Sequence, residues 1–149
     1  MQKWKKLKNR LFFYTRTGNS KRVAEKITAG LSCDAEQISD HMNWMGILGF
    51  IKAGFYSFTN RAVKIDPPAD LSVSVDDYIV VAPLWAGGLA PAAKALLRMI
   101  PKDRVNLVVI SDGSQLKDRS GYKSIYDITK NSDNENLVID RLVNNLLHT

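Results

Sequence analysis

Two apolar runs constrain the fold of this chain more than any other feature of its sequence. Residues 78–84 read YIVVAPL and residues 105–111 read VNLVVIS, so both runs are apolar at nearly every position. This pattern is typical of a strand that is buried on both faces, whereas a strand with one face in water alternates apolar and polar residues. The two runs therefore predict a sheet that helices cover on both sides.

Three shorter strands are predicted around these two runs. Residues 11–15 are apolar and aromatic and are bounded by charged residues and turn formers, residues 35–39 form a second short strand, and residues 123–129 form a fifth. In contrast, Asp76 and Asp77 are interpreted as a solvated turn before the strand at residues 78–84. With 149 residues, of which 45% are hydrophobic, the chain has the size of one domain spanning residues 1–149.

Helices are predicted between the strands, because apolar residues recur there every three or four positions. The first begins at Ser20 and is expected to stop near Gly30. The third begins at Pro91, and the last is opened by Ser132 or Asp133 with Glu135 near its positive end. Parallel strands need such crossover connections, so the alternation predicts an α/β fold.

The apolar stripe of residues 44–58 admits two interpretations. The simpler one is the second crossover helix, which would cover the sheet. The other is a lid or a hydrophobic docking face for a quinone or a membrane, because the segment is dense in aromatic residues and glycines. The apolar run at residues 42–51 is too short to span a bilayer, which takes about 20 residues.

The segment between the first strand and the first helix has the composition of an anion-binding turn. Free backbone N–H groups and the helix dipole favour negative charge at this point, and a glycine lets an anion approach the backbone. The same residue types are also ordinary helix caps and turn formers. The pattern lacks the spacing of a Walker loop or of a dinucleotide-binding motif. The residues are Thr15, Arg16, Thr17, Gly18, Asn19 and Ser20.

This turn resembles the phosphate-binding loop of the flavodoxin family, whose pattern is Thr/Ser-x-Thr-Gly-x-Thr/Ser. The match covers all six positions, and the alternation of strands and helices extends the similarity over nearly the whole chain. The resemblance implies a flavodoxin-like three-layer sandwich with a five-stranded, mainly parallel sheet of order 2-1-3-4-5. It also implies non-covalent FMN binding, with the 5′-phosphate in this loop and the flavin itself supplying the redox chemistry.

Two further loops correspond to the flavin-ring contacts of that family. The loop after the third strand offers Trp85 for stacking, with core packing as the alternative, and two glycines for close backbone approach. The loop after the fourth strand has the small residues of the family but lacks its usual aromatic residue. The residues of the two loops are Pro83, Leu84, Trp85, Ala86, Gly87 and Gly88, followed by Ser111, Asp112 and Gly113.

The chain departs from the family pattern after Ser111. Only about ten residues separate Ser111 from Lys123, which is too few for the usual fourth helix and its turns. We therefore expect a shortened or missing fourth helix, and the fifth strand is open to either direction at the edge of the sheet. The same shortening puts in doubt whether the outer face of a flavin is still covered.

The charge of the chain is the other departure from acidic electron carriers. The net charge is +6, and Lys3, Lys5, Lys6, Lys8 and Arg10 crowd the first ten residues. A solubilising, frayed terminus is the simplest interpretation of this cluster, and a polybasic membrane arm is the alternative. Nucleic-acid binding is not expected, because only Trp4 could stack on bases. The basic charge favours acidic redox partners.

Three functions remain open at this point: an FMN-dependent electron carrier between redox partner proteins, an FMN-dependent NAD(P)H or quinone-type reductase, and a non-redox phosphate-binding module that has lost flavin. We predict no catalytic side chain, because the flavin would supply the chemistry. No metal site is expected either, since His41 and His148 lack ligand spacing. A single Cys33 and the absence of a leader-like segment favour a cytoplasmic protein.

Overall fold

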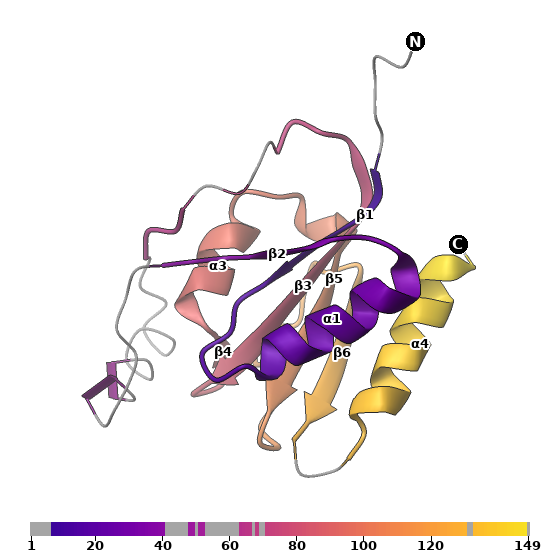
Figure 1. Ribbon diagram of the computed structural model, residues 1–149. Helices are drawn as coiled ribbons and strands as arrows, with labels where there is room; N and C mark the ends of the chain where they lie inside the picture. The colour runs from indigo at the N-terminus through magenta and orange to yellow at the C-terminus, as the bar shows by residue number, and fades with distance from the viewer. Residues whose placement is uncertain are drawn as a thin grey trace.

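A parallel sheet forms the centre of the computed structural model, which describes residues 7–40, 48–49, 51–52, 63–66, 68, 71–130 and 133–148 (Figure 1). The strands lie in the order β2-β1-β3-β5-β6, and every neighbouring pair along this path is parallel. This is the predicted order 2-1-3-4-5. The strands are β1 (Leu7–Phe13), β2 (Ala35–Gln37), β3 (Val75–Trp85), β5 (Val105–Ser111) and β6 (Ser124–Thr129).

A sixth strand, β4 (Gly88–Leu89), was not predicted from the sequence. It pairs antiparallel with the end of β3, so that Trp85 lies opposite Gly88. A strand of two residues is too short to show a hydrophobic period, which is why pattern analysis misses it. The main sheet is unaffected, because β4 lies off the path of the other strands.

Two layers of helices cover the sheet. Helices α1 (Asn19–Leu31) and α4 (Glu135–Leu147) pack on one face, and α3 (Pro91–Leu97) packs on the other (Figure 1). The alternation along β1 shows the division, because Leu11 and Phe13 point to the α1 and α4 side whereas Phe12 points to the α3 side. The predicted three-layer sandwich is therefore confirmed.

The connection between β5 and β6 contains no helix in residues 112–123, all of which are described. The predicted absence of the family's usual helix between these two strands is thus confirmed. The direction of the last strand is also settled, because β6 runs parallel to β5. The connection crosses the α3 side of the sheet, where the buried Leu116 joins the core and Tyr122 packs against it. A parallel crossover is therefore made here by a segment without a helix.

The first helix stops near Gly30 as predicted, one residue beyond the glycine itself. Helix α1 continues to Leu31, and Ser32 follows it in a left-handed conformation with φ of 53°. A Cβ atom placed on Gly30 would lie 2.9 Å from Cγ1 of Val143 in α4. The glycine therefore allows α1 and α4 to approach each other closely.

Strand β1 begins earlier than predicted and includes two residues of the basic cluster. Arg10 lies in the strand with its guanidinium 4.8 Å from the centroid of the Phe12 ring and 3.2 Å from Oε1 of Glu36. Lys8 also belongs to β1, so the interpretation as a frayed terminus is wrong for this part of the cluster. Lys3, Lys5 and Lys6 lie outside the described residues.

Asp77 is not in a solvated turn, because β3 begins at Val75. Its side chain is only 5% exposed and accepts a hydrogen bond from Nδ2 of Asn106 at 3.1 Å. Lys123 forms an ion pair with the same carboxylate oxygen. A carboxylate tolerates burial when it is paired in this way, and sequence spacing alone does not show the pairing.

The sequence predicts that Ser132 or Asp133 opens the last helix. Helix α4 is preceded by Asn134, so Asp133 does not open it, and Ser132 lies outside the described residues.

In the segment 44–58, only residues 48–49 and 51–52 are described, and they are helical. The choice between a crossover helix and a lid or docking face therefore concerns residues that the structure does not describe. Within the described residues, no helix has the length and apolarity needed to cross a membrane.

Candidate functional site

A small cavity lies at the carboxyl edge of the sheet, where the loops after β1 and β3 meet. Its volume is about 80 Å³, which suits a small anionic group. Ligands of open parallel sheets bind at this edge, at the point where the order of the strands reverses. Here β1 and β3 are adjacent and lead to opposite faces. The cavity is lined by Thr15, Arg16, Thr17, Asn19, Ser20, Pro83, Trp85, Ile110 and Lys130.

Backbone geometry makes the turn between β1 and α1 tight. The N–H of Tyr14 donates to the carbonyl of Val81 at 3.0 Å and keeps the chain against β3 just beyond the strand. The N–H of Gly18 then donates to Oγ1 of Thr15 at 2.8 Å. Gly18 has φ of 100°, a conformation that residues with a side chain rarely adopt. The glycine therefore allows α1 to begin immediately at Asn19.

The start of α1 presents positive potential to the cavity. The first intrahelical bond runs from the N–H of Arg22 to the carbonyl of Gly18, so the preceding amides have no partner within the helix. The first turn of α1 contains no acidic residue that would neutralise the helix dipole. Ser20 is buried at 2% exposure and lines the cavity from this turn. The arrangement favours an anion over a cation or a neutral group.

Arg16 supplies an unsatisfied donor at the same cavity. Its Nε atom is buried and has no hydrogen-bond partner among the described residues. An unpaired buried donor is costly, and a donor on a cationic side chain is best satisfied by an anionic oxygen. The residues present therefore fit a phosphate group. Thr17 and Ser20 of this loop could hold it together with Arg16.

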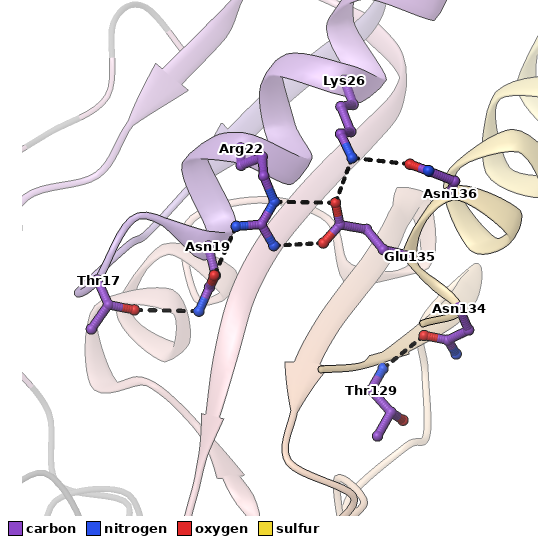
Figure 2. Close-up of polar contacts among 8 residues, drawn as sticks. All are labelled: Thr17, Asn19, Arg22, Lys26, Thr129, Asn134, Glu135 and Asn136. Atoms are coloured by element: carbon purple, nitrogen blue, oxygen red, sulfur yellow. Dashed lines mark hydrogen bonds and ion pairs between the residues drawn. The ribbon is translucent and has the colours of Figure 1, made fainter. Parts of the chain in front are cut away.

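Asn19 is held by Thr17 and Arg22, and Arg22 is held in turn by Glu135 of α4 (Figure 2). Its Nδ2 donates to Oγ1 of Thr17 at 3.4 Å, and its Oδ1 accepts from Nη1 of Arg22 at 2.8 Å. Arg22 in turn donates to both carboxylate oxygens of Glu135 in α4, at 3.1 and 2.6 Å. The orientation of the Asn19 amide is therefore determined by a residue on the last helix.

Electrostatics keep this cluster ionised. The hydrogen bond from Arg22 is the main cause that lowers the pKa of Glu135 from 4.5 to about 2, opposed by burial and supported by Lys26. Lys26 Nζ lies 2.7 Å from Oε2 of Glu135 and 3.0 Å from Oδ1 of Asn136. The hydrogen bond with Glu135 also raises the pKa of Arg22. Glu135 therefore stays an anion at any physiological pH.

Lys130 is a candidate residue that the sequence analysis missed. It follows β6, lines the small cavity, and also lines a larger one of about 330 Å³ beside Arg22, Lys26 and Glu135. Its N–H donates to the carbonyl of Ser111 at 2.9 Å, and its Nζ lies 3.4 Å from Oδ1 of Asp112. The signal was available, because Lys130 directly follows a predicted strand and so falls at the carboxyl edge.

The loop after β3 is a tight hairpin. Ala86 and Gly87 connect β3 to β4 with φ of 52° and 80°, which is the conformation of the two-residue turns that join antiparallel strands. Trp85 is half-buried and meets Tyr14 edge to face, with ring centroids 5.9 Å apart. It packs against the core and lines the small cavity, so both predicted roles of Trp85 remain compatible with its position.

The remaining predicted site residues lie apart from the small cavity. Ser111 is buried and its Oγ accepts from the N–H of Gly113 at 3.2 Å, while Asp112 and Gly113 are exposed. Leu84 is half-buried against the α3 side. Gly18 shapes the first loop without lining the cavity, and Ala86, Gly87 and Gly88 line a different cavity on the α3 side.

The described part of the chain offers no candidate metal site. No group of three or more His, Cys, Asp or Glu side chains there could hold an ion. His41 lies outside the described residues.

Comparison with known proteins identifies the fold. No family model matches the sequence, and no curated protein matches it. Crystal structures of candidate flavoproteins from Bacteroides eggerthii and Bacteroides uniformis match with TM-scores of 0.72 and 0.71, at 15% and 11% identity. The matches cover 94% and 93% of this chain, and 98% and 99% of those chains.

A third similar structure contains a cofactor. It is a flavoprotein from Lactobacillus acidophilus NCFM in complex with FMN, and it matches with a TM-score of 0.57 at 16% identity. The match covers 88% of this chain and 97% of that one. At these identities the likeness establishes the fold, which is that of the flavodoxin-like α/β proteins.

Proposed function

We propose that this protein binds FMN through the turn after β1 and transfers electrons between redox partners. The observation that carries the proposal is the buried Nε of Arg16, which has no partner among the described residues and belongs to a residue that lines the same small cavity as Asn19 and Ser20 at the start of α1. The flavodoxin-like fold, shared with a flavoprotein that holds FMN, supports the same assignment. Thr15, Thr17, Gly18, Asn19 and Ser20 would hold the phosphate.

The protein would contribute binding and orientation, and the flavin would contribute the electron chemistry. Trp85 and the Ala86 to Gly88 turn would lie along the ring, with Pro83 and Leu84 shaping this loop. Ser111, Asp112 and Gly113 would approach the ring from the neighbouring strand. No side chain is assigned a catalytic role. The positive charge of the chain favours acidic partner proteins, and the cytoplasm is the proposed location.

Calorimetric titration with FMN and with riboflavin tests the phosphate site. Replacing Thr17 and Ser20 together by alanine removes two hydroxyl donors to an anionic oxygen. We expect the Kd for FMN to rise roughly a hundredfold, which corresponds to about 3 kcal/mol, while the Kd for riboflavin stays unchanged.

The control removes two hydroxyls at the opposite end of the same helix, through Thr28→Ala with Ser32→Gly. Thr28 donates to the carbonyl of Glu25, and glycine suits the left-handed backbone of the exposed Ser32. Because both positions lie away from the loop, FMN binding should stay unchanged. A wild-type protein that gives no heat with FMN and stays colourless would overturn the proposal. That result would favour the non-redox phosphate-binding module.

A quinone-type reductase is the second candidate. It is favoured by a cavity of about 460 Å³ that opens beside Ala86, Gly87 and Gly88, where a small acceptor could reach the ring. Steady-state oxidation of NAD(P)H with quinones separates the two functions. Sustained turnover by the FMN-loaded protein would support the reductase, whereas a carrier would show almost none.

A further inference from the structure

The cavity of about 460 Å³ lies on the α3 side of the sheet and has the size of a small-molecule site. Its walls come from α3, from the β3–β4 hairpin, and from the helix-free connection between β5 and β6. The residues that line it are Ala86, Gly87, Gly88, Leu89, Lys94, Leu97, Arg98, Lys102, Leu116, Lys117, Asp118 and Tyr122.

The absence of a fourth helix leaves this cavity open. Residues 112–123 form bends and a turn without a helix, and Leu116 and Tyr122 pack against the core from this segment. The connection is fixed against the hairpin, because the N–H of Lys117 donates to the carbonyl of Gly87 at 3.2 Å. A Cβ atom on Gly87 would lie 2.9 Å from Cε of Lys117, so the two segments are in close contact. The cavity is therefore a feature of the fold and has defined walls.

Basic side chains dominate the polar part of the lining. Among the described residues of the lining, four are basic and one, Asp118, is acidic; the basic ones are Lys94, Arg98, Lys102 and Lys117. Asp118 accepts hydrogen bonds from the Oγ and N–H of Ser120, at 2.8 and 3.2 Å, and these bonds together with the charge of Lys102 lower its pKa, so it contributes one negative charge. The cavity therefore carries an excess of positive charge.

Two of these cations, Lys94 and Arg98, repel each other. Burial and the charge of Arg98 both lower the pKa of Lys94. The Nζ of Lys102 lies 4.4 Å from the centroid of the Tyr122 ring, a cation–π contact that places this charge at the aromatic wall. An anion in the cavity would relieve the repulsion between Lys94 and Arg98.

The rest of the lining is apolar. Leu89 and Leu116 are buried at 3% and 6% exposure, and Leu97 and Tyr122 are partly buried beside them. A ligand that satisfies both parts of the cavity needs an apolar body and an acidic group. Inorganic ions lack the apolar body, and neutral aromatic molecules lack the acidic group.

We propose that this cavity binds a small organic anion, with its apolar body against Leu97, Leu116 and Tyr122 and its carboxylate or phosphate group among Arg98, Lys102 and Lys94. Because the hairpin forms one wall, such a ligand would lie beside the turn assigned above to the flavin ring; only this adjacency rests on the proposed function. Binding of the anion itself does not require FMN.

The experiment is a calorimetric titration of the FMN-free protein with 2-naphthoate, 2-naphthyl phosphate and the neutral 2-naphthylmethanol. We expect at least one of the anions to bind about tenfold more tightly than the alcohol. The tighter of the two identifies the acidic group that the cavity prefers. Amide chemical shifts should change at Gly87 and Lys117, which form the wall.

Two variants place the effect in the cavity. Arg98→Gln with Lys102→Gln should remove the preference for the anions, whereas Lys21→Gln with Arg141→Gln lowers the net charge equally on exposed positions of α1 and α4 and should keep it. Arg98→Gln alone, at an exposed position, serves if the double variant does not fold. Equal affinity for the alcohol and both anions, or an equal loss in the control variant, would overturn the proposal. Failure of FMN binding would leave this result unchanged.

Discussion

The two faces of the sheet are covered in different ways. On one face, α1 and α4 each have 13 residues, and they contact each other through Gly30 and Val143 and through the Arg22–Glu135 ion pair. On the other face, α3 has seven residues, and a segment without a helix replaces the next crossover. We call the first face the closed face, because two long helices that contact each other cover it, although a cavity of about 330 Å³ lies where they begin. The second face, which we call the open face, contains a cavity of about 460 Å³.

This difference suggests a division of roles between the two faces. The closed face supports the turn after β1, because Glu135 holds Arg22 and Arg22 orients Asn19. The open face adjoins the β3–β4 hairpin and offers charged groups to a ligand. A site for a tightly held group and a site for an exchangeable ligand would thus be placed on opposite sides of the same sheet edge.

The largest expected effect compares one buried leucine from each face. Leu142→Ala, in α4 at 0% exposure, is expected to lower the free energy of unfolding by about 4 kcal/mol. Leu116→Ala, at 6% exposure beside the open cavity, is expected to cost about 2 kcal/mol, because fewer neighbours surround it. Urea unfolding measures both values.

The control for this pair is Leu137→Ala, at a position of α4 that is 64% exposed. It should change the stability by less than about 0.5 kcal/mol. Equal losses for Leu116 and Leu142 would show that the α3 face is as tightly packed as the other, and the comparison between the faces would fail.

The next effect concerns acid stability on the closed face. The pKa of Glu135 is lowered to about 2 in the folded protein, so this carboxylate stabilises the fold fully above its usual pKa of 4.5. The contribution is lost as the pH falls from 4.5 to 2. Between those pH values, wild type should lose about 1 to 2 kcal/mol more than Glu135→Gln, since solvent screens the half-exposed Arg22.

Urea unfolding at several acidic pH values measures this difference. Asp140→Asn is the matched control, because it removes an exposed carboxylate from the same helix and should keep the pH dependence of wild type. Identical acid profiles for wild type and Glu135→Gln would mean that the ion pair does not stabilise the contact between α1 and α4.

The smallest effect tests how closely α1 approaches α4. Alanine is a better helix former than glycine by about 1 kcal/mol, yet a Cβ on Gly30 would meet Val143 at 2.9 Å. We expect Gly30→Ala to destabilise the protein by about 1 kcal/mol through this overlap. In the background of Val143→Ala, the same change should become neutral or stabilising. A Gly30→Ala variant more stable than wild type would contradict the close approach.

Much of the fold could be predicted because burial and pattern agree. Strand β5 was predicted with its observed ends, since all seven of its residues are buried. The start of β1 and of β3 was missed, because Arg10 and Asp77 read as solvent-exposed residues. Their burial depends on Phe12, Glu36, Asn106 and Lys123, partners that mostly lie far away in the sequence.

The site could be predicted only in part. The turn after β1 has a local motif, so Thr15 to Ser20 were found from the sequence, and binding of a phosphate by them stays a prediction. Lys130 belongs to no motif, and the signal for it in the sequence is its position directly after a predicted strand. The cavity on the α3 side could not be foreseen either, since it arises from a missing helix and from basic residues on three separate segments.

The ion pair between Arg22 and Glu135 joins residues 113 positions apart. During synthesis the turn after β1 leaves the ribosome well before its support in α4 is made. The turn would therefore reach its final form only once α4 has been translated. By mass action, an anion bound at the turn would then protect α4 from local opening. Protection of α4 would therefore report binding at the turn after β1.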